Sequence, residues 1–92
     1  MVAVKKIVLD VLKPHQPNAL EFSRAVAAAG IGYRVQLTVL EVDEKTESIQ
    51  VVVSAPTIDF DTVEKTIKDM GGSVHSIDEV EVSNEGEHSE DS

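Results

Sequence analysis

The stretch IVLDVLKPH, residues 7–15, decides the fold of this chain together with VHSIDEV, residues 74–80. Aliphatic and β-branched residues run almost unbroken through the first stretch, which is typical of a strand covered on both faces. Asp10 interrupts the run. Its carboxylate must reach water, pair with a cation such as Lys13 or a neighbouring strand, or bind a ligand, because burying an unpaired charge is costly.

Outside these two stretches, apolar residues recur with the periods of strands and helices. The patterns predict strands over residues 4–13, 34–43, 48–53 and 73–82, helices over 18–29 and 60–70, and a hairpin turn at 44–46. Asp59 is expected to cap the second helix, while Gly30, in a left-handed conformation, and Gly71 are expected to end the two helices.

The resulting order, βαββαβ, predicts an α+β, ferredoxin-like two-layer sandwich with a four-stranded antiparallel sheet and two helices on one face. Its first and third strands lie in the middle, and its first and last strands are neighbours. Asp10 and Lys13 should therefore face the neighbourhood of His75 and Asp78. We expect residues 1–82 to form this domain and the polar, acidic residues 83–92 to form a disordered tail.

The charge distribution argues against polyanionic partners. The 92-residue chain carries a net charge of −9, and its segment 41–82 holds eleven acidic residues against three lysines. Nucleic acids and anionic membranes should repel such a chain, so we expect neither as a partner. The absence of cysteine excludes disulfides and thiolate metal sites. The N-terminal apolar run has no cleavage site for a signal peptide, so we expect a cytoplasmic protein without a membrane span.

A chain this short has a modest core, and association with further copies is one remedy. The sheet face away from the helices should carry some of Val8, Leu12, Leu40 and Val52, which makes that face more apolar than a solvated one. We therefore expect a homo-oligomer whose interface is this face or an edge strand.

Three segments, residues 7–15, 41–47 (EVDEKTE) and 71–80 (GGSVHSIDEV), resemble in order the signatures of the archaeal domain-of-unknown-function family 211. The similarity covers residues 2 to about 82. It implies a ferredoxin-like fold, a small cytoplasmic homo-oligomer and no established activity.

The polar residues of these signatures are the candidate site. We expect ligand or interface roles for Asp10, Lys13, His15, His75, Ser76 and Asp78. A second group, Glu41, Asp43 and Glu47, surrounds the hairpin turn and has the oxygen ligands of a divalent cation, with calcium or magnesium favoured there and zinc favoured where histidine takes part. Without metal, these three are an acidic hairpin tip, and the two histidines are structural or solvent-facing.

Other functions of this fold fit less well. The central strands have no aromatic residues for stacking RNA bases, and the loop after the first strand has neither the glycine nor the arginine of an acylphosphatase-like phosphate loop. A ligand-binding regulatory domain of the ACT type remains open. We therefore expect a non-enzymatic homo-oligomer that binds a small ligand or ion at subunit interfaces. The alternative is a metal-dependent enzyme, or enzyme subunit, using Asp10, His15, His75 and Asp78.

Overall fold

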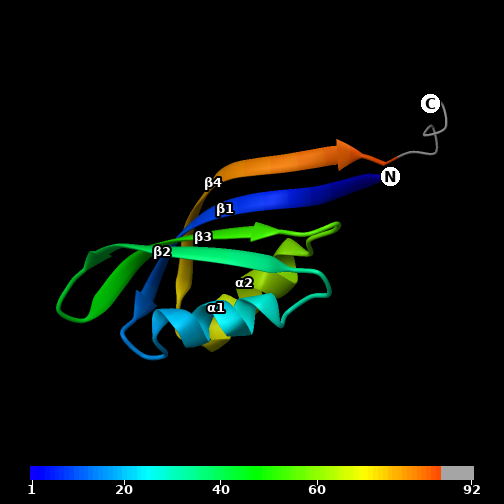
Figure 1. Cartoon of the computed structure of the whole chain (residues 1–92). Coiled ribbons are helices and arrows are strands. Elements are labelled where there is room, and N and C mark those ends of the chain that lie inside the picture. The colour runs from blue at the N-terminus through cyan, green and yellow to red at the C-terminus, as the bar shows by residue number, and fades with distance from the viewer. Residues whose placement is uncertain (86–92) are drawn as a thin grey trace.

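The computed structural model describes residues 1–85, and these form four strands and two helices in the predicted order (Figure 1). The elements are β1 (Val2–Pro14), α1 (Ala19–Ala27), β2 (Arg34–Val42), β3 (Thr46–Ser54), α2 (Phe60–Asp69) and β4 (Ser73–Asn84). The strands make one antiparallel sheet in the order β2-β3-β1-β4, with both helices on one side (Figure 1). This is the ferredoxin-like α+β fold that the sequence predicts.

The hydrophobic core fills the space between the sheet and the helices. Alternate residues of β1, namely Ile7, Leu9 and Val11, point into it and are almost fully buried, as the two-residue period of a strand requires. The other large members of the core are Phe22, Val26, Ile49, Val51, Val53, Ile58, Val63 and Ile67. The side of the sheet away from the helices therefore carries the residues between these positions, including Val8, Asp10 and Leu12.

Helix α2 has the expected ends. The Asp59 carboxylate accepts a hydrogen bond from the Thr62 amide, and Gly71 follows the helix with a φ of 87°. The Gly72 amide then donates to the Ile67 carbonyl over 2.9 Å, which satisfies a carbonyl in the last turn. This turn leads directly into β4.

Helix α1 differs from the prediction at its C-terminal end. Asn18 caps its start, but the helix ends at Ala27, and Ala28 keeps a right-handed conformation. The prediction of a left-handed Gly30 is wrong, because in this loop Gly32, and not Gly30, has a positive φ, at 77°. A Cβ atom on Gly30 would collide with the Tyr33 ring, so glycine is needed there for close packing.

The two neighbours of β1 pair with it differently. β3 pairs in unbroken register from Lys6 opposite Ser54 to Pro14 opposite Thr46. The pairing with β4 shifts at three points, and His75 and Asp78 are the extra residues in two of these bulges. The bulges turn the backbone of β4 beside Asp10.

Strands β1 and β4 are longer than predicted. Val2 and Ala3 pair with Asn84 and Ser83, because backbone pairing does not require apolar side chains. The first two residues of the predicted tail therefore belong to β4, while residues 86–92 of that tail lie outside the described part of the chain. Neither helix within residues 1–85 has the length and apolar composition that a membrane span requires.

Candidate functional site

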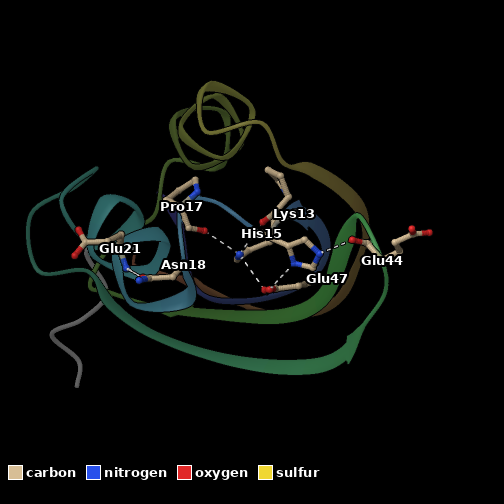
Figure 2. Close-up of polar contacts among 8 residues, drawn as sticks. Lys13, His15, Pro17, Asn18, Glu21, Glu44 and Glu47 are labelled. Atoms are coloured by element: carbon tan, nitrogen blue, oxygen red, sulfur yellow. Dashed lines mark hydrogen bonds and ion pairs between the residues drawn. The ribbon is translucent and has the colours of Figure 1, made fainter.

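The first group of signature residues is built around Lys13 and is defined here as the Lys13 cluster: Lys13, His15 and Glu47. Regular pairing of β1 with β3 places Glu47 directly opposite Lys13 on the helix-covered face. The Lys13 side chain has no exposed surface, and its Nζ lies 2.9 Å from Oε1 of Glu47. Two further hydrogen bonds, to the carbonyls of Pro14 and Pro17, use the remaining ammonium hydrogens (Figure 2).

His15 extends the cluster to the β2–β3 hairpin. Its Nδ1 lies 3.1 Å from Oε2 of Glu47, and its Nε2 lies 2.9 Å from the carbonyl oxygen of Glu44 (Figure 2). An ionised carboxylate and a carbonyl can only accept hydrogen bonds, whereas a neutral imidazole has a single N–H. The protonated imidazolium is therefore the form that satisfies both contacts.

The charges within the cluster favour this protonation state. The hydrogen bond to Glu47, assisted by the Glu44 carbonyl, raises the pKa of His15 above its ordinary value. The hydrogen bonds from His15 and then Lys13 hold the pKa of Glu47 below its ordinary range. Both shifts favour an arrangement in which the Glu47 carboxylate is shared by two cations, Lys13 and protonated His15.

The Lys13 cluster connects three parts of the fold. The ion pair between Lys13 and Glu47 joins the end of β1 to β3. Lys13 also donates to the Pro17 carbonyl in the loop before α1, and His15 contacts the Glu44 carbonyl in the β2–β3 hairpin. The Lys13 ammonium also lies 5.8 Å from the centre of the Phe22 ring of α1, within the range of a cation–π contact. The polar atoms of the cluster are engaged in contacts within the chain. The cluster therefore acts as a structural clamp, which means that it holds these three parts of the fold together.

The second group lies at β4 and is defined as the Asp10 cluster: Asp10, Ser76 and Asp78. Asp10 is opposite Ser76, and the Ser76 hydroxyl lies 2.7 Å from Oδ1 of Asp78. Asp10 is half-buried, and within residues 1–85 its carboxylate has no hydrogen bond or ion pair. This cluster therefore has carboxylate oxygens that remain available for a ligand or a partner.

The structure thus separates residues that the sequence analysis grouped together. Lys13 was expected near His75 and Asp78, but it lies on the opposite face of the sheet from Asp10 because the two positions are three residues apart in one strand. The ion pair of Lys13 is with Glu47 and not with Asp10. His75, an extra residue in a bulge, is exposed.

The predicted metal ligands are not gathered either. Glu47 is engaged by Lys13 and His15, while Glu41 is exposed on the edge strand β2. Within residues 1–85, no three side chains of histidine, cysteine, aspartate or glutamate are arranged to hold a metal ion. A cation at Glu41, Asp43 and Glu47 stays a prediction. The alternative of a metal-dependent enzyme also stays a prediction, and one of its proposed residues, His15, belongs to the Lys13 cluster.

Sequence reasoning missed the main role of Glu47 and the contribution of the Glu44 carbonyl. The role of Glu47 has a signal in the sequence, because pairing the first strand with the third brings Lys13 and Glu47 opposite each other. No sequence signal indicates which backbone carbonyl His15 reaches.

The fold and its two polar clusters define a small ferredoxin-like domain. Residues 5–87 match the model of the domain-of-unknown-function family 211, described as "Uncharacterized ArCR". The chain is also 38% identical over 80 residues to the uncharacterized protein MJ0319 of Methanocaldococcus jannaschii, covering 87% of this chain and 82% of that protein. The chain belongs to family 211, as its three signatures predict.

Proposed function

We propose that this protein is a non-enzymatic, homo-oligomeric domain of the cytoplasm that binds a small ligand or ion between subunits. The observation that carries the proposal is an apolar stripe on the edge strand β4, made of Ile77, Val80 and Val82. These side chains are 50%, 55% and 51% exposed. Exposed apolar side chains that lie next to one another are typical of a protein–protein contact.

The stripe continues the hydrophobic core. Ile77 is opposite Leu9 and Val80 is opposite Ile7, and both β1 partners are almost fully buried beneath the helices. Directly opposite residues share a face of the sheet, so the stripe lies at the open margin of the core. In Figure 1 the outer part of β4 leads away from the two helices, which leaves this margin uncovered.

The other edge strand, β2, also exposes apolar residues. Val39, Leu40 and Val42 are 41%, 59% and 63% exposed. An edge strand has unpaired backbone groups in addition to its side chains, and both can pair with another chain. A second copy that covers β4 or β2 would bury these side chains and would form hydrogen bonds with the unpaired backbone groups of the edge strand.

The ligand part of the proposal rests on the Asp10 cluster. Ser76 and Asp78 belong to β4 itself, and Asp10 is on the neighbouring strand. The stripe and the Asp10 cluster lie on opposite faces of the sheet, but a subunit that pairs with the edge of β4 borders both faces and so brings its own side chains close to these carboxylate oxygens. A small cationic ligand or a metal ion between two subunits fits this arrangement.

Native mass spectrometry of the purified protein, before and after treatment with a chelator, tests the proposal. We expect a defined oligomer, which Ile77→Glu converts to smaller species because a charge would be buried at the contact. Ile31→Glu is the matched control, since Ile31 is 98% exposed in the loop before β2. A wild-type monomer would contradict the proposal. Bound mass that the chelator removes would identify the ligand as a metal ion and favour the enzymatic alternative.

A further inference from the structure

A row of polar side chains crosses the sheet on the face away from the helices. Arg34 of β2 is opposite Ser54 of β3, which is opposite Lys6 of β1, which is opposite Glu81 of β4. Neighbouring strands lie about 4.8 Å apart, and directly opposite residues share a face. Arg34 and Lys6 therefore lie on either side of Ser54 on this face of the sheet.

This row borders two adjoining hollows that share Arg34 and Ser54. One has a volume of about 390 Å³ and is also lined by Gln36, and the other has a volume of about 360 Å³ and includes Lys5 and Lys6. Volumes of this size lie at the lower end of the range for small-molecule sites, about 300–1,000 Å³. The hollows lie at the end of the sheet remote from the Lys13 cluster, because β1 pairs with β3 from Lys6 to Pro14.

The charge around these hollows contrasts with that of the whole chain. Lys5, Lys6 and Arg34 border them, although the protein carries a net charge of −9; Glu81 also lines one of them, and Glu79 and Glu85 pair with the two lysines. Three of the eight lysines and arginines of the chain are thus gathered at one place.

The cations differ in how far they are already engaged. Lys5 pairs with Glu85, and Lys6 pairs with Glu79. In both ion pairs Nζ lies 3.2 Å from a carboxylate oxygen. Exposed ion pairs of this kind are weak and are readily exchanged for other partners. Lys5 also donates to the carbonyl of Pro56 over 2.8 Å. Within residues 1–85, the side chain of Arg34 has no ion pair or hydrogen bond, so the five N–H groups of its guanidinium are available.

We infer that the Arg34 hollow, defined by Lys6, Arg34 and Ser54, binds the phosphate group of a small metabolite. A guanidinium holds two phosphate oxygens at once, a lysine supplies a point charge, and a serine hydroxyl donates to a further oxygen. A phosphate has enough oxygens for donors from three strands, whereas a carboxylate has two. The net charge of −9 repels nucleic acids, so the ligand is a small molecule and not a polymer.

This binding site goes beyond the proposed assembly, because β1, β2 and β3 of a single chain supply all three side chains. A titration tests this site: inorganic phosphate is added to the protein in a buffer that contains no other phosphate, and binding is monitored through the amide chemical shifts. We expect Arg34→Gln to weaken phosphate binding about tenfold or more, since a charged bidentate contact is lost. Arg24→Gln is the control, because Arg24 lies exposed on α1 and pairs with Glu21. It should bind phosphate like the wild type.

Three results would overturn the inference. The first is equal phosphate affinity in the wild type and Arg34→Gln. The second is a set of phosphate-induced shifts spread over all lysines without a maximum at β1, β2 and β3. The third is binding of succinate at the same residues as tightly as phosphate, since a dicarboxylate would then suffice. Ser54→Ala, an exchange that removes only the hydroxyl, provides a second test should Arg34→Gln fail to fold, and it should also weaken phosphate binding.

Discussion

The Lys13 cluster and the Asp10 cluster begin three residues apart on the same strand, yet they differ in nearly every physical property. Lys13 is fully buried, and each of its ammonium hydrogens has an acceptor. Asp10 is half-buried, and within residues 1–85 its carboxylate has no ion pair or hydrogen bond. A saturated polar cluster stabilises the fold, whereas unsatisfied polar atoms at an edge are suited to binding.

The strand pairing explains this difference. The unbroken register between β1 and β3 brings Lys13 and Glu47 face to face, so the ion pair follows from regular geometry. The pairing of β1 with β4 is broken by bulges at His75 and Asp78 beside Asp10. Bulges redirect side chains and are frequent next to binding sites. The comparison therefore predicts large effects on stability from the first cluster and effects on assembly from the second.

The largest effect is expected from Glu47→Ala. Loss of this carboxylate leaves the Lys13 ammonium buried without a counter-charge, and breaking such a pair costs about 3–5 kcal/mol of unfolding free energy. Urea unfolding followed by circular dichroism, at one fixed protein concentration, measures this loss. Glu44→Ala is the control, because only the backbone carbonyl of Glu44 contacts His15. It should change the unfolding free energy by less than about 0.5 kcal/mol. Equal losses in the two variants would contradict the assignment of Lys13 and Glu47 as a clamp.

A smaller effect is expected from the protonation of His15. Its pKa is raised in the folded protein, so its contribution to stability is complete below the ordinary value of about 6.5 and is lost as the pH rises through the raised folded value. The pKa of Glu47 is lowered, so the contribution of Glu47 is present above its ordinary value and is lost only as the pH falls through the lowered one. Melting temperatures between about pH 5.5 and 8.5 therefore report on histidine protonation and not on Glu47.

The expected result is a wild-type melting temperature that decreases across this interval and a His15→Gln variant with a flatter profile. Glutamine keeps hydrogen-bond donors in its amide NH2 group but carries no titrating charge. A profile with the same slope in both proteins would show that the pH dependence comes from other groups and would remove His15 from the clamp.

The smallest effect on the fold is expected from Asp10→Asn. The Asp10 carboxylate has no partner to lose within residues 1–85, so the unfolding free energy of the subunit should change by less than about 0.5 kcal/mol. Assembly or ligand retention should weaken if Asp10 contributes its charge between subunits, and native mass spectrometry measures both. Asp61→Asn on the exposed surface of α2 is the control. Unchanged assembly and unchanged bound mass in Asp10→Asn would exclude Asp10 from the proposed site.

Much of the fold could be predicted because its signals are local. Alternating Val, Ile and Leu predict the strands, Asp59 and Gly71 predict the ends of α2, and the order of the elements leaves a single familiar sheet topology. The end of α1 could not be predicted in this way. Gly30 packs so close to the Tyr33 ring that a Cβ atom would collide with it, and that contact exists only after the chain has folded.

The candidate site shows the same division. The sequence by itself determined the family, the architecture and the set of polar residues in its three signatures. Only the tertiary structure decided which of them meet, because bulges and register are properties of paired strands and not of one segment. A carboxylate such as Glu47 looks the same in the sequence whether it binds a metal, faces water or closes on a buried lysine. The strand opposite it selects among these roles, because an ionised group is stable in the interior only where a counter-charge and hydrogen bonds compensate for the lost water.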